Sequence, residues 1–110
     1  MAKQYDAIVI GSGQGGNPLA HKLADLDWKV ALIEKEYLGG SCINYGCTPT
    51  KTMAASARVA YVARRAGEYG VTSGPVSVDL SDVVARKNKI VQQWRDGQQD
   101  HVEDRPTLDL

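Results

Sequence analysis

The first third of the chain alternates between short apolar runs and segments rich in glycine or polar residues. Residues 5–10 read YDAIVI and stop at a glycine, and residues 28–34 read WKVALIE. Short β-branched runs of this kind are typical of strands in the interior of a parallel sheet. The pattern therefore predicts two buried parallel strands over 5–10 and 28–34.

The segment between these two runs has apolar residues at helical spacing. Leu19, Leu23 and Leu26 lie three or four residues apart within residues 15–26. Pro18 falls in the first turn of the predicted helix, where its missing N–H costs little. Strand, glycine-rich turn, helix and strand together make a βαβ unit, so the sequence predicts an α/β fold that starts a parallel sheet.

Two long helices are predicted in the remaining part of the chain. Residues 51–66 are rich in alanine and lack glycine and proline, and Gly67 follows as an expected C-terminal cap. Asp79 is placed to cap a second helix over 80–99, in which the residues expected near one face are Leu80, Val83, Val84, Val91 and Trp94. Residues 105–110 begin another apolar segment, so we expect the chain to stop before its next strand, with an unpaired sheet edge and exposed apolar surface.

Composition narrows the class of protein. The 110 residues make about one domain, with 43% hydrophobic and 24% charged residues, which is an ordinary globular balance. Thirteen basic and thirteen acidic residues cancel. A nucleic-acid or membrane-surface partner usually requires a basic excess, so neither is expected. No segment resembles a signal peptide or a transmembrane helix, and a cytoplasmic protein is the default expectation.

A glycine fingerprint follows the first predicted strand. Residues 11–16 read GSGQGG and fit the pattern G-x-G-x-x-G, in which the glycines allow a tight turn, approach of a pyrophosphate and close helix packing. Glu34 comes eighteen residues after Gly16, where a carboxylate can accept hydrogen bonds from a ribose. A dinucleotide site is favoured over a merely flexible turn with Glu34 as a surface charge. The motif alone does not separate NAD from FAD.

Two cysteines, Cys42 and Cys47, lie five positions apart in a glycine-rich loop predicted over 39–46. A disulfide across so short a loop stabilises the fold little, on the order of 2 kcal/mol, so a redox role explains the pair better. Cys47 would lie just before the helix that begins near residue 50, with Lys51 one turn on, and both features favour a thiolate. Zinc would need two more ligands, and His21 and His101 are far away in sequence on predicted helix surfaces. Inert structural cysteines are the other alternative.

These motifs together resemble one known family. GSGQGG, then Glu34-Lys35, then GGSCINYGCTPTK closely resemble the class I pyridine nucleotide–disulfide oxidoreductases, which include dihydrolipoamide dehydrogenase, glutathione reductase and mercuric reductase. The resemblance spans essentially the whole chain. It implies a Rossmann-like FAD-binding domain, of which residues 1–110 would be the amino-terminal portion, incomplete at the carboxy terminus.

The resemblance also implies a role for each site residue. Cys42 would be the interchange thiol that meets the substrate, Cys47 would lie against the flavin, and Lys51 would lie near the flavin's reactive nitrogen. Glu34 would bind the adenosine ribose, with Lys35 beside it. The residues expected to hold the phosphates and the ribityl side of FAD are Gly11, Ser12, Gly13, Gly15, Gly16, Gly40 and Ser41.

The implied reaction passes electrons between NAD(P)H, FAD and the Cys42–Cys47 disulfide, and on to a dithiol, a disulfide or a mercuric ion. The NAD(P)H-binding and dimerisation domains of the family are not expected within residues 1–110, so this piece alone is expected to be inactive and its parent a homodimer. Tyr45 and Thr48 depart from the family's usual aliphatic residues, which leaves the electron acceptor open. A flavin- or nucleotide-binding module that stands alone, and a thiol redox protein without turnover, remain the alternatives.

Overall fold

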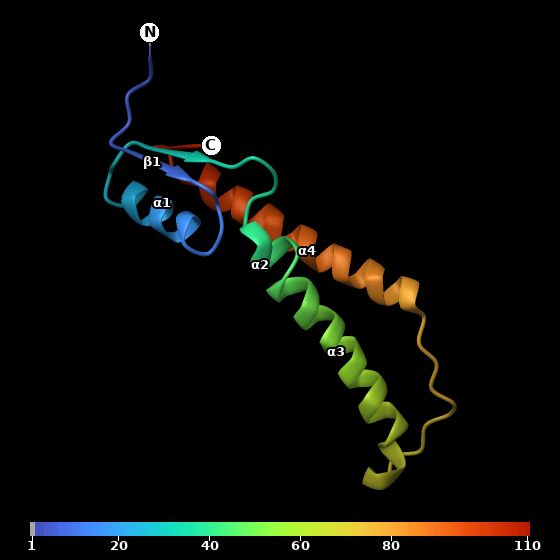
Figure 1. Ribbon diagram of the computed structural model, residues 1–110. Coiled ribbons are helices and arrows are strands. Elements are labelled where there is room, and N and C mark those ends of the chain that lie inside the picture. Colours follow the sequence, from blue (N-terminus) through green and yellow to red (C-terminus); the bar gives the residue numbers. More distant parts are fainter. Residues whose placement is uncertain (1) are drawn as a thin grey trace.

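The computed structural model describes residues 2–110, which form a small α/β body with a long helical arm (Figure 1). The molecule measures 68 × 24 × 19 Å, and its length comes from helices α3 and α4, which extend together away from the sheet. The helices are α1 (Gly16–Ala24), α2 (Gly40–Asn44), α3 (Cys47–Arg64) and α4 (Leu80–Glu103), with a 3-10 helix η1 at Ala66–Tyr69.

Three parallel strands make the sheet, in the order β1 (Ala7–Ile10), β2 (Val30–Ile33) and β3 (Leu108–Asp109). Ala7 pairs with Val30, and Val30 pairs with Leu108 on its other side. The predicted α/β class and its parallel βαβ unit are confirmed. The expectation that the chain stops before its next strand is wrong, because the apolar segment at its end forms the short strand β3, which pairs with β2.

The hydrophobic core lies on one face of this sheet. Val9, Val30 and Leu32 of the sheet form one buried cluster with Ala20 and Ala24 of α1 and with Val102 near the end of α4. Ile8, Ile10 and Ile33 are 61%, 82% and 51% exposed, respectively, because no described residue covers the opposite face. The expectation of fully buried strands is therefore wrong, whereas the expectation of exposed apolar surface is confirmed.

Helix α1 packs on the sheet through small side chains. Ala20 and Ala24 are buried and Leu23 packs against the core, whereas Leu19 and Leu26 are exposed, so only one of the three leucines at helical spacing contacts the core. The reason lies at the start of the helix, where a Cβ on Gly16 would overlap the carbonyl oxygen of Gly11. A helix held so close to the strand favours small side chains, such as Ala20 and Ala24, on the side that faces the sheet.

Helix α3 starts and ends earlier than its sequence predicts. It begins at Cys47 rather than near residue 50, so Cys47 is the first helical residue instead of preceding the helix. It ends at Arg64, and Gly67 lies within η1 rather than capping α3. The left-handed conformation that stops this segment belongs to Gly70, with φ 74°.

Helix α4 returns from the tip of the arm to the sheet and runs to Glu103, four residues beyond the predicted end. The Asp79 cap is confirmed, since its carboxylate accepts from the backbone N–H groups of Ser81 and Asp82. Val91 and Val102 are buried, but Leu80 and Trp94 are exposed. Val83 and Val84 are half-buried, so most of the apolar face predicted for α4 is at least partly covered, and only its Leu80 and Trp94 are exposed.

Candidate functional site

The turn between β1 and α1 owes its shape to glycine. Gly11 adopts φ +96°, and a Cβ on Gly16 would also lie 3.2 Å from Cγ1 of Val9. The first and last glycines of the fingerprint thus allow the turn and the close packing. Gly15 has open space around its Cβ position, so local packing does not require it. No side chain caps the N-terminus of α1, which leaves it available to an anion.

Ser12 and Glu34 join the ends of the two adjacent strands. The backbone N–H of Ser12 donates to Oε2 of Glu34 at 3.0 Å, and the Ser12 hydroxyl donates to the same oxygen. The N–H of Glu36 donates to Oε1 at 3.1 Å. The Ser12 hydroxyl, helped by these backbone donors, lowers the pKa of Glu34 below its ordinary value. Glu34 therefore stands as a carboxylate beside the glycine turn.

A second glycine pair docks the cysteine segment onto this turn. Gly39 and Gly40 adopt φ +101° and +67°, and a Cβ on Gly40 would lie 2.6 Å from Cα of Gly13. The N–H of Gly39 donates to the carbonyl of Ser12 at 3.1 Å. The glycine-rich loop predicted over 39–46 is not all loop, because α2 occupies Gly40–Asn44. Two segments far apart in sequence therefore meet backbone to backbone.

The structure pairs Cys42 and Cys47 in a disulfide whose Cα atoms lie 4.6 Å apart. Cys42 is half-buried on α2, and Cys47 is exposed at the first position of the eighteen-residue α3. A helix N-terminus stabilises a negative charge, so reduction of the disulfide would leave Cys47 where a thiolate is favoured. Lys51 lies one turn further along α3, exposed.

Two adjoining pockets lie beside Glu34. One of about 200 Å³ is lined by residues that include Glu34, Lys35, Gly40 and Ser41, which the sequence assigned to a single site. The other, of about 300 Å³, lies between Glu34 and α4 and includes Tyr37 and Arg95. Neither lining contains a cysteine, Lys51 or any residue of the 11–16 fingerprint, so these pockets bring together only four of the predicted cofactor residues: Glu34, Lys35, Gly40 and Ser41.

Three residues at this site have roles that sequence patterns did not reveal. Arg95 of α4 donates to the side-chain oxygen of Asn44, and its guanidinium carbon lies 3.8 Å from the centroid of the Tyr37 ring. Asn44 lies between the two cysteines, which is the only signal in the sequence that could have drawn attention to it. Arg95 is fifty-one residues away from Asn44, and no local pattern connects them.

The two histidines are closer than their separation in sequence suggested. The rings of His21 and His101 lie 6.1 Å apart in a T-shaped arrangement. His21 is half-buried, so its description as a plain surface residue is wrong; burial first, and then Arg105, lower its pKa. Within residues 2–110 no three His, Cys, Asp or Glu side chains cluster as metal ligands. Across the same residues, no helix has the length and apolar character needed to span a membrane.

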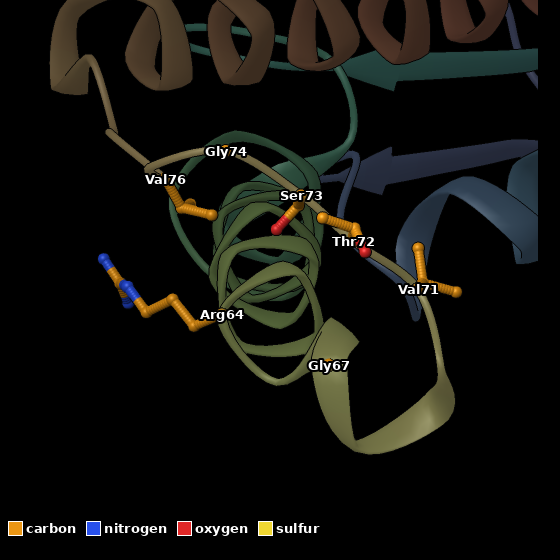
Figure 2. A pocket seen from close by; sticks show the side chains of 7 residues that line it. All are labelled: Arg64, Gly67, Val71, Thr72, Ser73, Gly74 and Val76. Atoms are coloured by element: carbon orange, nitrogen blue, oxygen red, sulfur yellow. The ribbon is translucent and has the colours of Figure 1, made fainter.

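A further pocket, of about 400 Å³, lies at the tip of the arm, where the chain turns from α3 toward α4. Figure 2 shows Arg64 and Val71 of its lining pointing to opposite sides of α3. Cys47 begins α3 and Arg64 ends it, and eighteen helical residues span about 27 Å. This pocket is therefore remote from the disulfide and does not belong to the candidate site.

Fold and site together define a Rossmann-like α/β domain that carries a disulfide on the segment docked against its glycine turn. Residues 5–105 match the family described as "Pyridine nucleotide-disulphide oxidoreductase", and the chain belongs to this family.

Individual relatives agree with this assignment. The chain is 46% identical over 98 residues to dihydrolipoyl dehydrogenase of Acholeplasma laidlawii, covering 88% of this chain and 29% of that protein. It is 40% identical over 97 residues to the Bacillus subtilis dihydrolipoyl dehydrogenase, covering 88% of this chain and 20% of that protein. The chain thus spans between a fifth and a third of the length of these relatives.

Solved structures give the same result. A Cu(II) complex of a cysteine-to-serine mutant of the HOCl-induced flavoprotein disulfide reductase RclA from Escherichia coli superposes with a TM-score of 0.79 at 32% identity, over 99% of this chain and 21% of that one. The unmutated RclA matches with a TM-score of 0.71 at 34% identity, over 96% of this chain and 21% of that one.

Proposed function

We propose that the protein carrying this chain is an FAD-dependent disulfide oxidoreductase, and that residues 1–110 form the amino-terminal portion of its FAD-binding domain. The reaction moves two electrons between NAD(P)H and a dithiol or disulfide substrate through the Cys42–Cys47 pair. One observation carries the proposal: the disulfide segment rests directly on the glycine turn, with Gly40 against Gly13. A dinucleotide bound at that turn would be held next to the disulfide segment.

The residues at the turn fit the diphosphate and ribose of FAD. The uncapped start of α1 presents N–H groups to an anion, and positive-φ glycines keep side chains out of the space above the turn. Glu34 is ionised, half-exposed and lines both neighbouring pockets, so it can accept from ribose hydroxyls. Gly40, Ser41 and Lys35 line the pocket next to it. When bound, FAD supplies the hydride and electron-transfer chemistry.

The two cysteines divide the thiol chemistry between them. In the reduced pair, the thiolate of Cys42 attacks one sulfur of a substrate disulfide, which forms a mixed disulfide and releases one substrate thiol. Cys47 then attacks the sulfur of Cys42, which releases the second substrate thiol and restores the Cys42–Cys47 bond. The substrate thus gains two electrons and two protons, and the cysteine pair loses them. The helix start at Cys47 favours the thiolate that this second step needs.

Substitution of each cysteine in the flavin-loaded protein tests the proposal. The Cys42→Ser protein should show a long-wavelength absorbance band from a Cys47 thiolate beside the flavin without added reductant, and Cys47→Ser should lack this band under all conditions. Both should lose at least about a hundredfold in turnover. A wild-type protein that folds but takes up no flavin would exclude the proposed function.

A metal ion is the second candidate substrate. The observation that favours it is the solved RclA flavoprotein, whose cysteine-to-serine mutant is 32% identical to this chain and is described as a Cu(II) complex. Thiolates are soft ligands that suit copper and mercury ions. NADH or NADPH oxidation stimulated by Cu(II) or Hg(II), and abolished by Cys42→Ser, would support a metal substrate; oxidation stimulated only by lipoamide or another disulfide would exclude it.

We also propose that the working form is a homodimer located in the cytoplasm. Light scattering would test the oligomeric state, and cell fractionation would test the location.

A further inference from the structure

Asn44 is a buried polar residue between the two cysteines, and its side chain is fully engaged. It is 7% exposed. Its Nδ2 donates to the carbonyls of Leu38 at 3.1 Å and Gly40 at 2.8 Å, and its Oδ1 accepts from Nε of Arg95. One amide therefore ties the turn before α2, the helix α2 itself and the distant helix α4 together.

The turn that Asn44 holds is the one that meets the glycine fingerprint. Gly39 donates to Ser12 on one side of this turn, and Gly40 lies against Gly13, so close that no side chain fits between them. A shift of the turn at Leu38–Gly40 would therefore move Cys42 relative to the first glycine turn, because α2 starts at Gly40.

Arg95 contacts both halves of the candidate site. Its Nε binds Asn44 on the cysteine side, and its guanidinium stacks on Tyr37, which lines both pockets beside Glu34. A guanidinium can form such a hydrogen bond and a stacking contact at the same time, whereas an ammonium cannot reproduce this geometry. Arg95 is half-buried, so solvent competes only in part for these contacts.

We propose that Arg95 is a positioning residue: through Asn44 it fixes the cysteine-bearing helix α2 against the glycine turn, and so sets both the dithiol–disulfide equilibrium of Cys42–Cys47 and the affinity for the dinucleotide. This inference rests on the proposed function for the nature of the ligand. The hydrogen bonds among Arg95, Asn44 and the turn at Leu38–Gly40 form within this chain and require no bound ligand.

The test compares Arg95→Met with Arg86→Met in the flavin-loaded protein. Arg86 lies on the same helix and donates to a backbone carbonyl, that of Thr52 on α3, but does not touch α2. The measurements are the equilibrium constant of the cysteine pair against dithiothreitol, the Kd for FAD, and kcat and KM separately. Arg95→Met should change the equilibrium constant and the Kd each by about tenfold, while Arg86→Met stays within about twofold of wild type.

A double-mutant cycle tests the route through Asn44. Asn44→Leu removes both the acceptor for Arg95 and the donors to Leu38 and Gly40, without adding a charge, so it should shift the equilibrium as Arg95→Met does. The double mutant should then change little beyond either single mutant, because both break the same network. Fully additive effects would overturn the proposal. Arg95→Lys should recover only part of the wild-type equilibrium, and if Arg95→Met does not fold, Arg95→Lys and Asn44→Leu give the same comparison.

The outcomes separate this inference from the proposed function. If the wild-type protein takes up no flavin but Arg95→Met still shifts the dithiol–disulfide equilibrium, the proposed function fails, and with it the effect of Arg95 on dinucleotide affinity, whereas its effect on the Cys42–Cys47 pair stands. If flavin binds normally and Arg95→Met is indistinguishable from Arg86→Met in equilibrium constant and Kd, the positioning role is wrong.

Discussion

The carboxylate of Glu34 and the backbone N–H of Ser12 lie 3.0 Å apart, which joins the carboxyl ends of two adjacent parallel strands. Ser12 is fully buried and Glu34 is at the edge of two pockets, so the contact connects the interior of the glycine turn to a surface that can accept a ligand. The carboxyl ends of parallel strands are where open α/β sheets bind ligands. The position of this pair supports a nucleotide site here on grounds independent of the cysteines.

This pair predicts a specific loss of stability in acid. Hydrogen bonds from Ser12 hold the pKa of Glu34 below its ordinary value of 4.5, so the folded state favours the carboxylate. The stabilisation is therefore present above pH 4.5 and is lost as the pH falls through the lowered pKa. Glu34→Gln should lower the Tm by a few degrees at pH 7, and the difference from wild type should shrink between pH 4.5 and pH 3.

Thermal unfolding followed by circular dichroism from pH 7 to pH 3 measures this effect. Glu103→Gln is the control, since Glu103 is exposed and its acceptor role toward Gln99 survives the change. A Tm difference between Glu34→Gln and wild type that stays constant down to pH 3 would contradict the argument.

Alanine substitutions at three glycines can separate two reasons for glycine at position 40: its close contact with Gly13 and its positive φ. Gly40→Ala should cost at least about 2 kcal/mol, because the residue has φ +67° and its Cβ would lie 2.6 Å from Cα of Gly13. Gly70→Ala should cost about 1 kcal/mol, since its φ is also positive but its Cβ position is open. Gly97→Ala, in the interior of α4 with open space around it, should stabilise the protein by about 0.5–1 kcal/mol.

Urea unfolding of the three alanine variants gives these free energies directly. Equal losses at Gly40 and Gly70 would show that the contact with Gly13 contributes nothing beyond the backbone conformation.

The sequence predicted correctly the parts of the fold that depend on local sequence alone. The runs at 5–10 and 28–34 gave both strands, and GSGQGG gave the turn. The face of α1 was predicted only in part: Leu23 contacts the core, but Leu19 does not, because Leu19 fits the helical period as well as the buried Ala20 does. Only the tertiary contact of Gly16 with Gly11 decides that small residues must face the sheet.

The candidate site could likewise be predicted only in part from the sequence, because one of its elements is very short and one of its contacts is long-range. Helix α2 has only five residues, which is too few to show a helical period in the sequence. The sequence therefore predicted a loop over 39–46. The glycine fingerprint, Glu34 and the spacing of the cysteines drew attention to the site, and the resemblance to a family assigned an expected role to each residue. It could not find the Arg95–Asn44 contact, which depends on α4 crossing α2 fifty-one residues later.

The cap of α4 should contribute measurably to the stability of the arm. The Asp79 carboxylate accepts from the N–H groups of Ser81 at 2.8 Å and Asp82 at 3.3 Å, and also from the Ser81 hydroxyl. Asp79→Ala should therefore lower the free energy of unfolding by about 1 kcal/mol, and Asp79→Asn, which keeps an acceptor oxygen, by less. Asp82→Ala is the matched control. Urea midpoints that are the same for Asp79→Ala and Asp82→Ala would show that the cap is not stabilising.

The histidine pair predicts a second loss of stability at mildly acidic pH. Burial, Arg105 and His101 each lower the pKa of His21, and the opposing influence of Asp25 is smaller than any of them. The folded state therefore favours neutral His21, whereas the unfolded chain takes up a proton near pH 6.5. Stability is fully present above pH 6.5 and declines as the pH falls from 6.5 through the lowered pKa. This window lies above the one in which Glu34 titrates, so the two effects can be separated.

Substitution of His21 by glutamine should remove this decline. Between pH 7.5 and pH 5.5 the wild-type Tm should fall by a few degrees, and that of His21→Gln should fall less, because glutamine takes up no proton. His101→Gln is the informative partner: it removes one of the groups that lower the pKa of His21 but leaves the burial and Arg105 in place. Its Tm should therefore still fall, though by less than that of wild type. Parallel Tm profiles for wild type and His21→Gln over this range would mean that protonation of His21 does not affect folding.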